Sequence, residues 1–85
     1  MSAVKGVVVP TEWDDYGNVV ALAISSNDEK EYIVDKKGKG RELLSLIRKE
    51  VEVTGVITEE DQKKIIRVSK YRLAEHADPE ESLPN

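Results

Sequence analysis

The segment Lys37-Gly38-Lys39-Gly40-Arg41 is the part of the sequence that comes nearest to a phosphate-binding motif. Glycines between cations are typical of loops that hold a phosphate group. The segment lacks the spacing of a Walker P-loop and the Lys-Ser/Thr pair that ends one. We therefore interpret it as a connection in which glycine supplies backbone angles that other residues avoid.

Other groups that could perform catalysis are few. The chain has no Cys and a single His, His76, which stands among acidic residues near the end and is interpreted as a solvated side chain. The adjacent acids Asp14-Asp15 and Glu59-Glu60-Asp61 fall in predicted turns and lack the longer ligand pattern of a calcium loop. Neither G-x-S-x-G nor H-E-x-x-H occurs. We expect no catalytic site, no metal and no cofactor, and conclude that the protein is not an enzyme.

Aromatic and basic side chains are the remaining candidates for binding a ligand. Rings could stack on bases and cations could contact phosphates. The acids within EWDDYGN (12–18) and TEEDQ (58–62) oppose phosphate binding. We expect at most weak, salt-sensitive binding of single-stranded nucleic acid, with an oligosaccharide as another possible ligand. The candidate residues are Trp13, Tyr16, Tyr32, Lys36, Lys37, Lys39, Arg41, Lys70 and Arg72.

Five short apolar runs and one amphipathic stretch must position these side chains. Valine-rich or alternating segments predict strands over residues 4–10, 18–25, 31–35, 50–57 and 63–73, the first of them stopped by Pro10. Leu43, Leu44 and Ile47 fall at helical spacing and predict a short helix near residues 40–48 that turns these three side chains toward the core. Arg48 and Lys49 would lie at the helix end, where the macrodipole favours cations.

Alternation along the strands predicts which residues face the core. In the second strand, Val20, Leu22 and Ile24 are expected inside, which leaves Val19, Ala21 and Ala23 as a smooth outer face for a partner. In the fourth and fifth strands the expected inward residues are Val51, Val53, Gly55, Ile66 and Val68. A bulge is expected to turn Tyr71 or Leu73 inward as well, and Gly6 and Gly55 mark sharp bends.

Three strands, a short helix and two strands favour an all-β fold, a small five-stranded antiparallel barrel with the helix between strands 3 and 4. The stretch ELLSLIRKEVEVTGVI, followed by KKIIRVSKY, resembles the helix and last two strands of small bacterial OB-fold domains. The resemblance covers about residues 4–73 and concerns architecture, since many functions use this fold. An SH3-like barrel is the alternative, but it usually lacks a full helix at this place.

Charge and length complete the prediction. The 85 residues carry a net charge of -4, and all of it comes from Glu75, Asp78, Glu80 and Glu81. We expect a barrel domain over residues 3–73 and a flexible acidic tail over 74–85. No apolar run is long enough for a membrane span, and the start lacks the hydrophobic region of a secretory signal. We expect a cytoplasmic monomer, a small non-enzymatic binding module acting through a protein partner, with weak nucleic-acid or oligosaccharide binding as the alternative.

Overall fold

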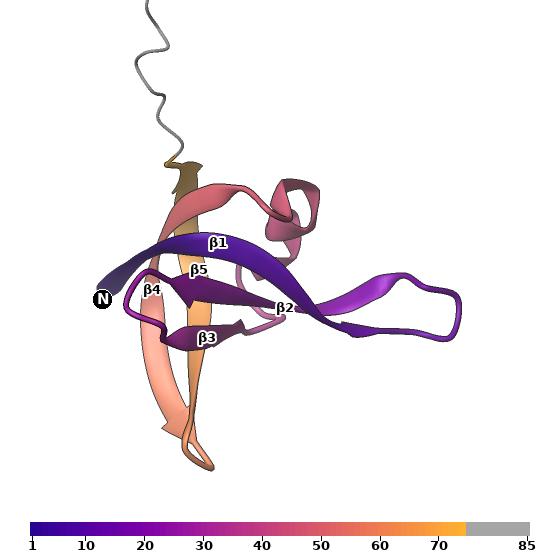
Figure 1. The fold of residues 1–85 in the computed structure, drawn as a ribbon. Helices are drawn as coiled ribbons and strands as arrows, with labels where there is room; N and C mark the ends of the chain where they lie inside the picture. The colour runs from indigo at the N-terminus through magenta and orange to yellow at the C-terminus, as the bar shows by residue number, and fades with distance from the viewer. Residues whose placement is uncertain (75–85) are drawn as a thin grey trace, which may run out of the picture.

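The computed structural model describes residues 1–74, so the predicted acidic tail from residue 75 on, with His76, lies outside the described residues. Five strands and one short 3-10 helix follow one another along the chain (Figure 1). This order confirms the predicted fold class, with the helix between the third and fourth strands. The elements are β1 (Ser2–Trp13), β2 (Val19–Ser26), β3 (Glu31–Val34), η1 (Gly40–Leu46), β4 (Glu50–Glu60) and β5 (Lys63–Leu73).

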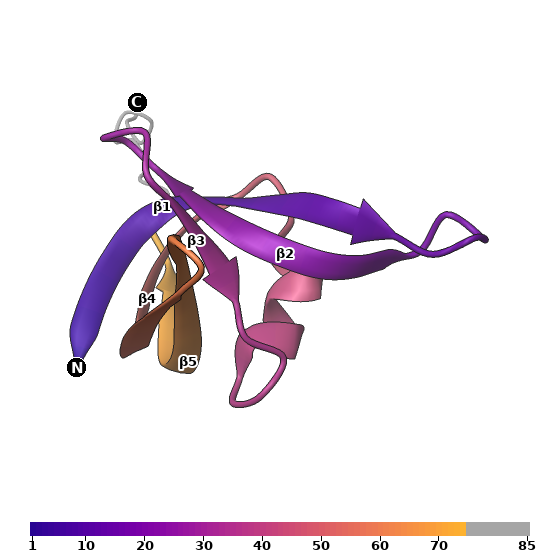
Figure 2. The same ribbon diagram turned by 90° about the horizontal axis from the view of Figure 1, so that it is seen from below.

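The strands close into a barrel in the order β1-β2-β3-β5-β4, with β4 returning to β1. Four of the pairings are antiparallel, but β3 and β5 run parallel, so the prediction of a wholly antiparallel sheet is wrong at this one contact. The reason is the connection through η1, which carries the chain from β3 to the far side of the barrel (Figure 2). The β4–β5 hairpin then returns β5 to β3 in the same direction.

The core lies inside the barrel and is made of alternate residues from each strand. Leu22 and Ile24 of β2 are buried in it, as alternation predicted, and so are the predicted inward residues of β4 and β5. No polar or charged side chain of residues 1–74 is buried. The core therefore depends on apolar burial alone. Its members are Val4, Val8, Leu22, Ile24, Val34, Leu43, Val51, Val53, Ile66 and Val68.

The start of β2 departs from simple alternation. Val20, predicted to face the core, is 40% exposed, whereas Val19 packs against the core. Two register shifts between β1 and β2 explain the reversal: Pro10 pairs with Leu22, Glu12 with Ala21 and Trp13 with Val19. The residues left without a partner, one in each strand, are bulges, and a bulge redirects the side chains that follow it.

Strand β1 does not stop at Pro10 but continues to Trp13. Beyond Val7, β1 no longer pairs with β4, so Pro10 lies in a strand with one free side. Proline is tolerated in such edge positions because a missing N–H breaks no ladder there. The extension pairs with β2 and gives a long arm that projects from the barrel (Figure 1).

The strands β4 and β5 lie very close together at Gly55. A Cβ atom added there would overlap the carbonyl oxygen of Arg67. The register shifts at the same place, so that Ser69 is an extra residue in β5 and its hydroxyl donates to the Thr54 carbonyl at 3.0 Å. This bulge confirms the predicted one: Tyr71 turns inward against the core, while Leu73 stays 47% exposed.

The helix is a 3-10 helix of seven residues, and within residues 1–74 no helix has the length and apolar character needed to cross a membrane. Three residues per turn place Leu43 and Leu46 on the same side, where Leu43 enters the core and Leu46 packs against it. Leu44, predicted to face the core, is therefore turned outward and is 44% exposed. Arg48 follows the helix with a positive φ of 73°, so the predicted cationic helix end is also wrong.

Candidate binding site

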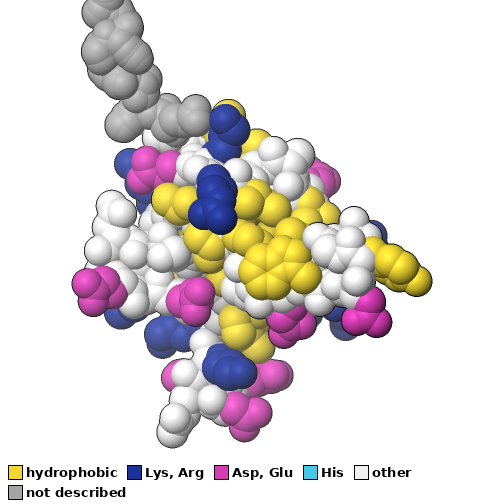
Figure 3. All heavy atoms as spheres, turned by 45° about the vertical axis from the view of Figure 1, so that its right-hand side comes forward, with side chains coloured by type: hydrophobic (Ala, Val, Ile, Leu, Met, Phe, Trp, Pro, Cys, Tyr) yellow, Lys and Arg dark blue, Asp and Glu magenta, His cyan; other side chains and the backbone are white. Residues whose placement is uncertain are grey.

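A groove of about 320 Å³ opens on the outside of the barrel between β2 and η1. Its size is near the lower end of the range for ligand sites. Hydrophobic side chains gather over the region of η1 and the β1–β2 arm, with Lys or Arg among them (Figure 3). The groove is lined by Val19, Val20, Ala21, Leu22, Val34, Asp35, Lys36, Gly40, Arg41 and Leu44.

The groove exists because the chain turns away from β2 after the end of β3. Strand β3 pairs with β2 only from Ala23 to Ser25. The connection to η1 follows β5 instead, since the Asp35 amide donates to the Ile66 carbonyl and the Lys39 amide to the Val68 carbonyl, each at 2.8 Å. The space beside the first half of β2 is therefore bounded by η1 rather than filled by a strand.

The charged residues of the groove differ in what they contact. The carboxylate of Asp35 accepts a hydrogen bond from the Lys37 amide at 2.9 Å and lies 3.8 Å from Arg67 Nε. Lys36 and Arg41 are exposed and take part in none of the salt bridges among residues 1–74. The groove thus offers an apolar floor with two cations whose charge is available to a ligand.

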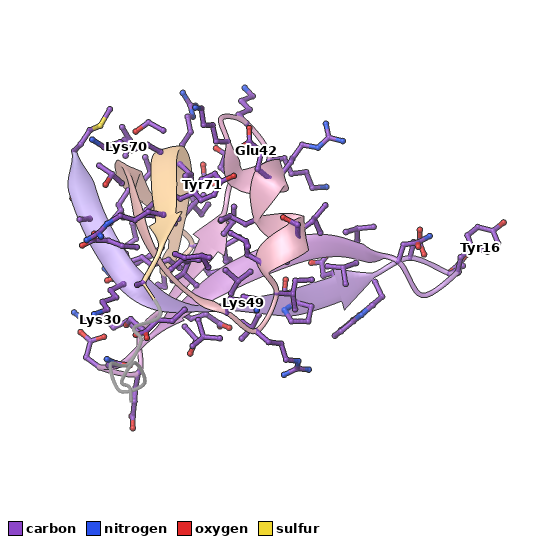
Figure 4. The ribbon with its side chains drawn as sticks, turned by 90° about the horizontal axis from the view of Figure 1, so that it is seen from above. Tyr16, Lys30, Glu42, Lys49, Lys70 and Tyr71 are labelled. Carbon is purple, nitrogen blue, oxygen red and sulfur yellow. The ribbon has the colours of Figure 1, made fainter. Side chains whose placement is uncertain are left out.

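The three predicted aromatic ligand residues are not brought together. Trp13 is 56% exposed and Tyr16 is 90% exposed, and Figure 4 shows Tyr16 at the far tip of the arm. Tyr32 pairs with Ile24, an inward residue, and packs against the core. Since directly paired residues point to the same face of a sheet, Tyr32 cannot join the other two rings in one stacking surface.

The predicted basic residues fall into two groups: four lie on or beside the connection from β3 to η1, and two lie on β5. Lys36 and Arg41 line the groove, and Lys37 and Lys39 are exposed on the same connection. Lys70 lies at the opposite end of the molecule from Tyr16 (Figure 4).

Arg72, the last of the predicted basic residues, is held by a carboxylate. Its Nε and Nη2 atoms lie 2.8 and 2.6 Å from Glu52 Oε1. The pairing leaves Arg72 less charge to offer a ligand than the cations beside the groove.

The predicted partner face is divided by the bulges. Val19 and Ala21 line the groove, while Ala23 is fully buried although it faces away from the core. Its neighbours across the sheet are Val9 on β1 and Ile33 on β3. Side chains directly opposite each other on one face are close enough for these two to cover the small methyl group. The predicted face is therefore two surfaces, of which only the first belongs to the groove.

Among residues 1–74, three titratable groups have shifted pKa values, and none of the three lines the groove. Hydrogen bonds from Asn18, both its amide and its side chain, and from the Tyr16 amide lower the pKa of Asp14 at the arm tip. A hydrogen bond from the Ser26 hydroxyl lowers the pKa of Asp28 in the β2–β3 turn. Each of the two carboxylates organises a turn.

Tyr71 is the third group with a shifted pKa, and it joins β5 to η1. Its hydroxyl donates to Glu42 Oε1 at 2.7 Å, which raises the pKa of Tyr71, and the two side chains lie together in Figure 4. This hydrogen bond therefore fixes η1, and with it one wall of the groove, to the barrel.

A second hollow of about 280 Å³ lies near the other end of β2, beside the β2–β3 turn. It contains Tyr32, the basic Lys5 and the acidic Asp28, whose carboxylate is occupied by Ser26 and lies 4.0 Å from Lys30. Residues 1–74 contain no group of three or more His, Cys, Asp or Glu side chains placed to hold a metal ion. The groove is consequently the better-defined candidate site.

Sequence reasoning placed Val19 and Ala21 on an outer face but missed other apolar residues that line the groove. Val20 and Leu44 were assigned to the core, yet both are exposed and line the groove. The signal that could have found the site is VVAL (19–22), a run of four apolar residues at a place where alternation requires two to be exposed.

Comparison with protein-family models, with curated proteins and with solved structures finds no significant match for this chain.

Proposed function

We propose that this chain is a non-enzymatic binding module that engages a protein partner through the groove between β2 and η1. The observation that carries the proposal is an apolar groove, open to solvent, on a barrel whose core is closed. Apolar surface of this kind, bordered by polar groups, is characteristic of interaction sites. The charged groups at its rim, Asp35, Lys36 and Arg41, supply orientation and charge rather than an acid–base pair.

The resemblance to OB-fold domains supports a binding role of this general kind. It draws support from the order β1-β2-β3-β5-β4 and from the helix between β3 and β4. OB-folds bind ligands on the face that includes strands 2 and 3, and the groove lies along β2. The resemblance narrows the place of binding but leaves the kind of ligand to the chemistry of the groove.

That chemistry favours a protein over a nucleic acid. A nucleic-acid site requires several cations along a continuous track and rings that stack on bases. Here the arm tip carries Asp14 and Asp15, and the β4–β5 turn carries Glu59, Glu60 and Asp61, which repel phosphates. An apolar floor with two cations suits an apolar side chain flanked by carboxylates.

Site-specific photocrosslinking tests the proposal. The photoreactive amino acid p-benzoylphenylalanine replaces Leu44 in the full chain, and in a matched control it replaces Val56, whose exposure of 49% is close to the 44% of Leu44. Val56 lies on β4, outside the groove. In cells that express the chain, we expect a discrete protein adduct from position 44 that is absent from position 56. Equal adducts from both positions, or none from position 44, would contradict a protein site in the groove.

Single-stranded nucleic acid is the second candidate, and the exposure of Trp13 and Tyr16 favours it. We expect weak binding at most, lost at about 0.15 M salt because exposed charges are screened there. Fluorescence anisotropy with mixed-sequence oligonucleotides measures this. Sub-micromolar affinity that persists at that salt and falls with Trp13→Ala would favour nucleic acid over the protein partner.

A further inference from the structure

The two sides of β2 differ in how much of the strand is paired. On one side β1 pairs with β2 from Ser26 back to Val19. On the other side β3 pairs only from Ser25 to Ala23, so residues 19–22 have no strand partner there within residues 1–74. This unpaired edge lies where β3 would have continued had it not ended at Val34.

The unpaired edge forms one wall of the groove. All four consecutive residues, Val19, Val20, Ala21 and Leu22, line it. Leu22 points into the core, whereas Val20 is 40% exposed. Since residues that point to different sides line the same groove, the groove runs along the edge of the strand, where the backbone N–H and C=O groups are.

This edge lacks the charged side chains that usually prevent strand pairing. Natural edge strands are shielded by charges, prolines, bulges or covering elements. Residues 19–22 include no charged residue and no proline. The bulge at Val20 twists the edge and so limits an added strand to a few residues.

The opposite wall supplies charge and an apolar contact. Lys36 and Arg41 stand at the rim without a salt-bridge partner in the described part of the chain, and Leu44 of η1 is exposed and lines the groove. Lys37 and Lys39 add positive charge on the same connection. A complementary segment would carry carboxylates and at least one aliphatic side chain.

We propose that an extended, acidic segment of a protein partner adds to β2 as a short strand along residues 19–22. Its carboxylates lie beside Lys36 and Arg41, and an aliphatic side chain packs on Leu44. Main-chain hydrogen bonds to the strand edge supply part of the affinity, and the side-chain contacts supply selectivity. The inference rests on the proposed function, because it uses the same groove, but it adds the conformation and charge of the partner.

Selection from a phage-displayed library of random 12-residue peptides, with the full chain as bait, tests the partner's chemistry. We expect enriched peptides to combine acidic residues with an aliphatic residue two positions away, since residues two apart face the same side of a strand. Enrichment of basic peptides, or no enrichment, would overturn the inference. So would self-association of the chain that Leu44→Glu abolishes, because the groove would then be occupied by a second copy.

Backbone methylation of one enriched peptide tests the strand itself. N-methyl groups are placed at successive positions, one per synthetic peptide, and binding to the full chain is measured by calorimetry. Strand addition predicts that methylation weakens binding at every second position and has little effect between them, because alternate N–H groups face the strand edge. A loss without this period of two would overturn strand addition.

Variants of the chain separate this inference from the proposed function. Leu44→Glu should raise the peptide Kd more than about tenfold, because a carboxylate would replace the apolar contact and repel the acidic peptide. Lys36→Glu and Arg41→Glu should each raise it up to about fivefold, and Val56→Glu should leave it unchanged. If Leu44→Glu acts but methylation shows no alternation, the groove remains the site and strand addition is wrong. If Leu44→Glu and Val56→Glu act alike, both proposals fail.

Discussion

The two long hairpins of the barrel, β1–β2 and β4–β5, each extend past the neighbour that pairs with them near the barrel's centre. Within residues 1–74, the part of β2 before Ala23 has a strand partner only in β1, and the part of β4 after Gly55 has one only in β5. Their edges carry different residues. Residues 19–22 of β2 are Val, Val, Ala and Leu, whereas β4 ends in Thr58, Glu59 and Glu60.

The difference shows how one barrel protects one edge and leaves another open. Charged residues on an exposed edge discourage a further strand, because pairing would bury their charge. The acidic end of β4 has this protection. The apolar part of β2 does not, and it is the part that borders the groove. The β4–β5 hairpin therefore has a protected free edge, whereas the open edge of the β1–β2 arm is the one that we propose a partner uses.

A glycine substitution in each hairpin should show the largest contrast. Gly55→Val would force a side chain into the Arg67 carbonyl. We therefore expect the free energy of unfolding to fall by more than about 4 kcal/mol, so that no cooperative unfolding transition remains. At Gly17, on the arm tip, an added Cβ meets no atom within 4 Å, but the φ of 86° strains any residue other than glycine. We therefore expect Gly17→Ala to lower the free energy of unfolding by about 1 kcal/mol. Urea unfolding followed by circular dichroism measures both. A Gly55→Val protein as stable as wild type would contradict this close approach of β4 and β5.

Truncating one aliphatic side chain in each hairpin should give a smaller contrast. Ile66 on β5 is fully buried, so Ile66→Ala should lower the free energy of unfolding by about 2–5 kcal/mol. Val20 on β2 is 40% exposed, so Val20→Ala should change it by less than about 0.5 kcal/mol. The same urea titration applies. Equal losses would mean that Val20 belongs to the core, as alternation alone predicted.

The smallest effect should be the acid sensitivity of the arm tip. The pKa of Asp14 is lowered below its usual 3.8 by hydrogen bonds from Asn18 and the Tyr16 amide. The ionised Asp14 carboxylate therefore stabilises the arm tip fully above its unfolded-state pKa, and this stabilisation is lost as the pH falls through the lowered folded-state pKa. Amide NMR shifts of Tyr16 and Asn18 should titrate in this acidic range. Asp14→Asn should remove this pH-dependent change of the amide shifts, whereas Asp15→Asn should leave it in place. If the change persisted in Asp14→Asn, another group would be responsible for it.

Much of the fold could be predicted from the sequence because each strand carries its own pattern. The alternation of Val51, Val53 and Gly55 identified the inner face of β4. A bulge in the last strand was expected to turn Tyr71 or Leu73 inward, and it turns Tyr71. These features depend on local periodicity. The parallel contact between β3 and β5 depends on the path of a connection, which periodicity does not encode.

The exposed apolar residues of the groove, Val20 and Leu44, were missed for a related reason. Whether Val20 or Val19 faces the core is decided by bulges between β1 and β2, and the orientation of Leu44 is decided by three rather than 3.6 residues per turn. In each case the residue that faces the core lies one position away from the one that regular periodicity predicts, or leaves its neighbour exposed. Of the residues predicted to bind a ligand, Lys36 and Arg41 line the groove, whereas Trp13, Tyr16 and Tyr32 lie elsewhere.

The closure of the barrel also has a kinetic consequence. Strands β1 and β4 pair residues that are between 43 and 53 positions apart in the chain, and β3 pairs with β5 over 32 positions. Each of these contacts requires a large loop to close before it contributes any stability, whereas the hairpins form from neighbours. High contact order slows folding, and β-barrels of this kind fold in roughly milliseconds to seconds. The refolding rate should consequently depend on how quickly the first strand finds the fourth.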